Sequence, residues 1–227
     1  GVHLALTEDR IRAFTTKFWH DPDLLPTAVR EAAELRRCPM CPLAGQGGLC
    51  DALRPALTFL DEVNRFASYD SVTAIYRSPE TDMLRIATPV SVQHALRDVA
   101  FLSLISYCQN GQQKFGRYFR GIAPLLETVE IANRLYLNIF WIHHGDRDAV
   151  NQAVEVFARE ILIATRNQNA RMHLLCTNDA FLNAFVAAQV AIELLTINVE
   201  DRLRKSFDGG LIGHVEGEPA AQVTHSA

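Results

Sequence analysis

Apolar residues recur every three or four positions along most of the chain, which is the spacing of α-helices that bury one face. The pattern after Asp146 is the clearest, with Val150, Val154, Phe157 and Ile161 on one stripe. It predicts helices over 7–20, 26–37, 51–67, 91–108 and 128–142, two further helices that begin at Asp146 and Asn178, and a short segment over 112–120.

Residues 71–88 follow a different pattern. Val72, Ala74 and Tyr76 alternate with polar or small neighbours, and the turn-forming stretch 78–82 precedes a second alternating run. A period of two indicates half-buried β-strands, so we expect a two-stranded hairpin here. Two strands alone are marginally stable, and the hairpin should therefore lean on the helices.

These elements predict a mainly α fold, a multi-helix antiparallel bundle with one small β-hairpin at about 71–88. Asn110 and Gly111 should break the chain between helices, and Thr128, Asp146 and Asn178 should each cap the N-terminus of a helix. We expect one helical domain over 1–207, made of cysteine-loop helices (1–67), the hairpin (68–90) and the bundle (91–207), and a disordered tail over 208–227.

Composition narrows the function classes. The 227 residues are 48% hydrophobic and carry a formal net charge of −4, which argues against nucleic acid or a membrane surface as the partner, since both need a basic face. No apolar run reaches the roughly 20 residues that span a bilayer. The odd number of cysteines, five, and an N-terminus that turns charged at Glu8 favour a reduced, cytoplasmic protein.

The chemistry in the chain is concentrated in one loop. Cys38 and Cys41 have the C-x2-C spacing, and Cys50 follows after eight intervening residues. Such a knuckle lets two thiolates reach one metal ion, and Pro39 and Pro42 stiffen it. Cys108, at the end of an apolar helix, is the best candidate for a fourth ligand.

Other cysteines and histidines are weaker candidates. Cys176 is typical of an ordinary buried thiol, although it or a histidine could replace Cys108. His143 and His144 are more readily explained as residues at a helix C-terminus. Thiolate ligands suit either zinc or a [4Fe–4S] cluster. The other alternative is that the loop holds three free thiols and no metal.

A rival interpretation is a thiol–disulfide oxidoreductase or peroxidase-like enzyme in which Cys38 attacks and Cys41 resolves. This chemistry needs a lowered thiol pKa, and these cysteines follow a helix C-terminus, where the dipole disfavours a thiolate. The bundle helices contain no Glu-x-x-His pair of the kind that builds a di-metal site.

The order of these features resembles an uncharacterised family of bacterial domains. The matching residues are Cys38-Pro39-Met40-Cys41-Pro42-Leu43, Cys50, Ser68-Tyr69-Asp70-Ser71-Val72 and Tyr107-Cys108. The resemblance implies that Cys38, Cys41, Cys50 and Cys108 act together, and it implies no activity. The family's later cysteines tend to precede proline, whereas Asp51 and Gln109 follow them here.

The sequence therefore predicts a cytoplasmic helical module with a four-cysteine site for zinc or an iron–sulfur cluster. We expect a structural or sensory role more than a catalytic one. We also expect association with a second copy or another protein through an exposed helical or hairpin surface.

Overall fold

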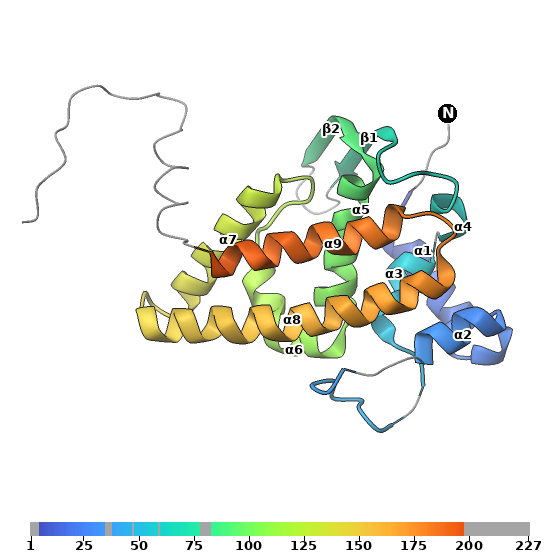
Figure 1. Ribbon diagram of the computed structural model, residues 1–227, viewed down its shortest axis with the longest axis horizontal. Coiled ribbons are helices and arrows are strands. Elements are labelled where there is room, and N and C mark those ends of the chain that lie inside the picture. Colours follow the sequence, from blue (N-terminus) through green and yellow to red (C-terminus); the bar gives the residue numbers. More distant parts are fainter. Residues whose placement is uncertain (1–4, 35–37, 47, 59, 78–82, 198–227) are drawn as a thin grey trace, which may run out of the picture.

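The computed structural model describes residues 5–34, 38–46, 48–58, 60–77 and 83–197, and the fold in this part of the chain is mainly helical with one two-stranded antiparallel hairpin (Figure 1). This confirms the predicted fold class. The predicted tail over 208–227 lies outside the described residues, as does the predicted end of the second helix at 35–37.

Short helical segments make up the N-terminal part. They are α1 (Glu8–Phe14), a π-helical turn (Thr15–Trp19), a 3-10 turn (Pro22–Leu24) and α2 (Thr27–Glu34). Thr7 caps α1, because its Oγ1 accepts the Arg10 N–H at 3.2 Å. The observed start of the helix therefore agrees with the predicted start at residue 7.

The helix predicted over 51–67 is wrong as a continuous element. It consists of a 3-10 turn (Asp51–Leu53), α3 (Arg54–Leu57) and α4 (Leu60–Val63). The Thr58 hydroxyl donates to the Arg54 carbonyl at 2.7 Å, a side-chain bond that often bends helices. Beyond α4, the Asp70 carboxylate accepts the Ala67 N–H at 2.9 Å and holds a turn in place of further helix.

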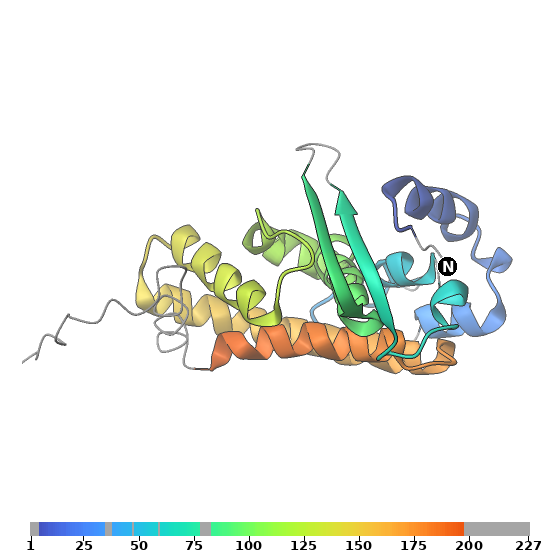
Figure 2. The same cartoon turned by 90° about the horizontal axis from the view of Figure 1, so that it is seen from above.

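The hairpin pairs β1 (Ser71–Arg77) with β2 (Leu84–Ser91), and Ile75 lies opposite Ile86. It projects from the helical body (Figure 2). β2 runs three residues further than the predicted end at 88, and pairing continues at its base, where the Val92 N–H donates to the Asp70 carbonyl at 2.9 Å. Ile75 and Ile86 are both exposed. Association with another molecule through the hairpin surface stays a prediction.

The long helices form the core. They are α5 (Val92–Phe101) with a π-helical extension (Leu102–Tyr107), α6 (Gln109–Phe115) with a 3-10 turn (Gly116–Phe119), α7 (Thr128–Ile142), α8 (Arg147–Leu175) and α9 (Ala180–Glu193), which ends in a 3-10 turn (Leu194–Thr196). α8 and α9 lie side by side and antiparallel, and α5 packs against α9 (Figures 1 and 2). The predicted stripe residues Phe157, Ile161, Phe181 and Phe185 are all fully buried.

Two of the three predicted helix caps are wrong by one residue. Asp146 caps α8 as expected, and its Oδ1 accepts two backbone N–H groups. The cap of α7 is Glu127 instead of Thr128, in a reciprocal capping box with Glu130. Asp179 holds the N-cap position of α9, while the side chain of Asn178 donates to a backbone carbonyl.

None of the helices in the described part of the chain is both long enough and apolar enough to cross a lipid bilayer.

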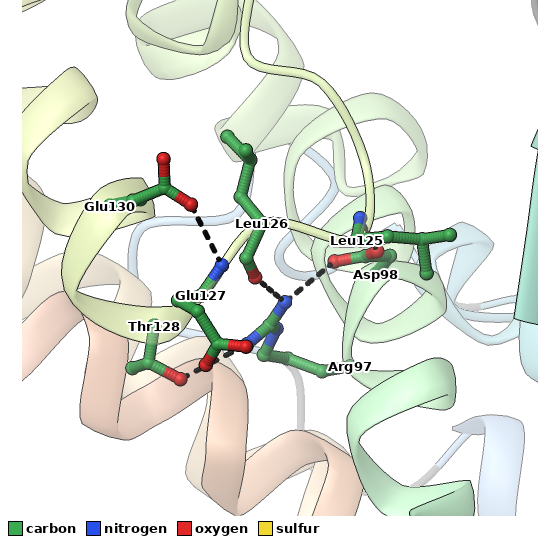
Figure 3. A network of polar contacts seen from close by, with 7 residues as sticks. All are labelled: Arg97, Asp98, Leu125, Leu126, Glu127, Thr128 and Glu130. Atoms are coloured by element: carbon green, nitrogen blue, oxygen red, sulfur yellow. Dashed lines mark hydrogen bonds and ion pairs between the residues drawn. The ribbon is translucent and has the colours of Figure 1, made fainter. Parts of the chain in front are cut away.

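A buried arginine fastens the loop before α7 to α5 (Figure 3). The Arg97 guanidinium is 3% exposed and donates to Thr128 Oγ1 at 3.0 Å and to the Leu126 carbonyl. Its neighbour Asp98 accepts the Leu125 N–H at 2.6 Å. Leu125 has a φ of 61°, a left-handed conformation that costs a leucine energy and that this hydrogen bond helps to hold.

We predict that Arg97→Met lowers the free energy of unfolding by about 1–3 kcal/mol, because it leaves the Leu126 carbonyl and the Thr128 hydroxyl without their donor. Denaturant unfolding measures the loss, with Arg134→Met on the exposed side of α7 as the matched control. Equal stability of the two variants would show that the Arg97 network contributes little.

Candidate metal centre

All four predicted cysteines line one cavity. Cys38, Cys41 and Cys50 approach it from the loop, and Cys108 approaches it from the junction of α5 and α6. The cavity is small, about 20 Å³, which is room for about one water molecule or one ion. Its remaining walls are Met40, Leu43, Asp51, Ala52, Gln109, Asn110, Ala164, Gln168 and Arg171.

The cysteine loop is a series of tight turns. The Cys41 N–H donates to the Cys38 carbonyl at 2.9 Å, and the Ala44 N–H donates to the Cys41 carbonyl at 2.9 Å. The Cys50 N–H donates to the Ala33 carbonyl at 2.9 Å, which fixes the far end of the loop to α2. Gly45 has a φ of 84°, a conformation that favours glycine. The loop therefore has the compact form that the C-x2-C spacing predicts.

Cys108 lies at the N-cap of α6, and the prediction that Asn110 and Gly111 break the helix is wrong. Both residues are buried inside α6. A Cβ at Gly111 would come within 1.9 Å of the Leu104 carbonyl oxygen, so only glycine lets α6 pack this closely against the end of the α5 extension. The first turn of α6 directs the backbone N–H groups of Asn110 and Gly111 at the Cys108 sulfur.

α8 supplies polar side chains on the opposite side of the cavity. Asn167 Nδ2 donates to Cys38 Sγ at 3.2 Å, and Gln168 Nε2 donates to Cys50 Sγ at 3.4 Å. Arg171, 1% exposed, lies one turn further along the same helix face. Sequence reasoning missed all three. The signal for Gln168 and Arg171 was the continuation of the buried α8 stripe after Ala164, whereas Asn167 lies beside that stripe and had no such signal.

Burial dominates the electrostatics of two of these thiols, Cys38 and Cys108. It raises the pKa of Cys38, against the opposing effects of the Asn167 hydrogen bond and the Arg171 charge. It raises the pKa of Cys108 to about 11, although the Gly111 N–H acts in the other direction. Without a bound cation these two groups are neutral thiols at pH 7. A raised pKa argues against Cys38 as the attacking thiolate of an oxidoreductase.

Asp51 connects the two halves of the site. Its carboxylate accepts Trp19 Nε1 at 2.8 Å and Gln109 Nε2 at 3.0 Å, and it forms an ion pair with Arg54. The residues that follow Cys50 and Cys108 are therefore hydrogen-bonded to each other.

The other candidate ligands lie elsewhere. Cys176, at the C-terminal end of α8, does not line the cavity, and burial raises its pKa to about 12. His143 ends α7, where its Nε2 lies 3.2 Å from the Tyr118 hydroxyl, and His144 follows it in an exposed position. Neither histidine lines the cavity.

The described residues contain no group of three or more His, Cys, Asp or Glu side chains whose arrangement could hold a metal ion. All five cysteines are free thiols. The four sulfurs thus share a cavity without meeting as a ligand set, and their assignment as ligands stays a prediction. Comparison with protein-family models, with curated proteins and with solved structures finds no match.

We predict that Gly111→Ala lowers the free energy of unfolding by about 1–3 kcal/mol, because the added methyl group clashes with the Leu104 carbonyl. Gly116→Ala, where a Cβ would have no atom within 4 Å, is the matched control and should be neutral or stabilising by about 0.4–1 kcal/mol. Thermal unfolding of both variants tests the close approach of α6. The prediction fails if Gly111→Ala is as stable as Gly116→Ala.

Proposed function

We propose that the chain is a helical module in which Cys38, Cys41, Cys50 and Cys108 together bind a metal ion, with a structural or sensory role and no catalysis. The observation that carries the proposal is that these four residues, from two distant parts of the sequence, line one cavity. Cys176, which sequence reasoning set apart from this group, is also apart from it in space.

The chemistry of the cavity supports thiolate coordination. Three of the four sulfurs have N–H donors aimed at them, from Asn167, Gln168 and the first turn of α6. Donors of this kind stabilise a thiolate more than a neutral thiol, because the hydrogen bond is then charge-assisted. Metal binding would release the thiol protons that burial otherwise retains.

The size of the cavity favours a single ion such as zinc over an iron–sulfur cluster. Its volume of about 20 Å³ suits one ion, whereas a four-iron cluster would require its walls to separate. Zinc–sulfur bonds are about 2.3 Å long, so coordination would draw the sulfurs closer together than they are without metal.

A bound ion would cross-link the cysteine loop to the start of α6. The loop is joined to α2 through Cys50, and α6 packs on the extension of α5. Loading and release of the ion would therefore stabilise or loosen the contact between the N-terminal helices and the bundle. Such a coupling suits a structural staple or a sensor. Free thiols in the site suit a reducing, cytoplasmic setting.

We predict about one zinc ion per chain in protein purified without oxygen. Cys108→Ser should lower the metal content at least tenfold under mild chelation, since one of four thiolates is lost. Cys176→Ser should retain the wild-type content. Elemental analysis with a sulfide assay measures both, and iron with matching sulfide would identify a cluster at the same cysteines.

Two results would contradict the proposal. One is a Cys108→Ser variant that holds as much metal as Cys176→Ser. The other is a metal-free wild-type protein whose Cys38 and Cys41 are oxidised and reduced in turn by a peroxide and a thiol reductant, which would support the oxidoreductase interpretation instead.

A further inference from the structure

Two amide oxygens beside the sulfurs are buried without a hydrogen-bond donor. Asn110 and Gln168 both line the cavity, and each is 2% exposed. Asn110 Oδ1 and Gln168 Oε1 have no hydrogen-bond partner in the part of the chain that the structure describes. A buried carbonyl oxygen costs free energy until a donor reaches it, which is why buried polar side chains nearly always have partners.

A charged neighbour fixes the orientation of the Asn110 amide. Its Nδ2 donates to Glu160 Oε2 at 2.8 Å, and Lys114 forms an ion pair with the same carboxylate oxygen at 2.9 Å. An ionised carboxylate only accepts hydrogen bonds, so the reversed amide would place two oxygens against each other. Asn110 Oδ1 is therefore the atom of this amide that is left for another donor.

The amide of Gln168 lies at the sulfur side of the cavity. Its Nε2 donates to Cys50 Sγ at 3.4 Å, and Oε1 is bonded to the same amide carbon. The cavity volume of about 20 Å³ exceeds the roughly 10–15 Å³ that one water molecule requires. A buried water also needs about two to four polar partners, and the two amide oxygens and the neighbouring sulfurs are suitable groups.

We propose that the cavity is a binding site for one water molecule, which donates one hydrogen bond to Asn110 Oδ1 and one to Gln168 Oε1. Water is a small, neutral molecule with two donors, so it satisfies both oxygens within this volume. The water site does not depend on metal binding. One consequence rests on the proposed function: because the cavity has room for one water or one ion, a metal ion must displace the water.

Oxygen-17 magnetic relaxation dispersion of the reduced, metal-free full-length chain tests the site, because it counts the water molecules held inside a protein. We expect Gln168→Met, which keeps the length of the side chain and removes the acceptor, to hold about one long-lived water fewer than the wild type. Gln152→Met, exposed on the same helix, is the matched control and should hold the wild-type number. A Gln168→Met variant with the wild-type number would overturn the inference.

Electron density decides the question if Gln168→Met does not fold, which circular dichroism shows. Crystals of the reduced, metal-free wild type should contain a water molecule within hydrogen-bond distance of both Asn110 Oδ1 and Gln168 Oε1. Well-defined density for the two side chains with no water at either oxygen would overturn the inference.

Addition of zinc separates this inference from the proposed function. We expect one equivalent of zinc to lower the number of long-lived waters in the wild type by about one, because the ion takes the same space. A wild type that binds zinc and keeps the water would overturn the displacement. A wild type that binds no zinc would overturn the proposed function and leave the water site in place.

Discussion

Burial of polar groups between the cysteine loop and α8 is the constraint on which this structure depends. Amides, a guanidinium and sulfurs are withdrawn from water together, and each such group costs free energy unless it finds a partner. The bonds from Asn167 to Cys38 and from Gln168 to Cys50 are partners of this kind. Apolar residues at these positions would need no such partners, so the polar lining sets this part of the core apart from the rest.

The surrounding fold makes that burial possible. Gly111 lets α6 approach the end of the α5 extension, which brings Cys108 to the cavity. Asp51, the residue after Cys50, then accepts a hydrogen bond from the side chain of Gln109, the first residue of α6. The long helices α8 and α9, with α5 packed on α9, form the scaffold behind these contacts. The site is therefore assembled from local features at helix ends and turns, and it is continuous with the core, to which Cys38 and Ala164 both belong.

Much of this arrangement follows from the sequence, because the spacing of apolar residues determines local elements such as strands and helices. The hairpin, the cap at Asp146 and the buried stripe of α8 follow from spacing and composition. The four predicted cysteines line one cavity, and their role as ligands stays a prediction. Neither the helix break at Thr58 nor the continuation of helix through Asn110 and Gly111 follows from the sequence. Each depends on a contact, with Arg54 and with Leu104 respectively, that helix propensities do not describe. Arg171 was overlooked because a basic residue on a long helix is usually solvated, and only the path of the apolar stripe shows that this one is buried.

X-ray absorption at the metal edge of protein purified without oxygen tests the central claim most directly, because it counts the sulfur ligands. We predict four sulfur neighbours at about 2.3 Å around a single zinc ion. A first shell dominated by oxygen or nitrogen, or one with fewer than three sulfurs, would contradict a site built from Cys38, Cys41, Cys50 and Cys108.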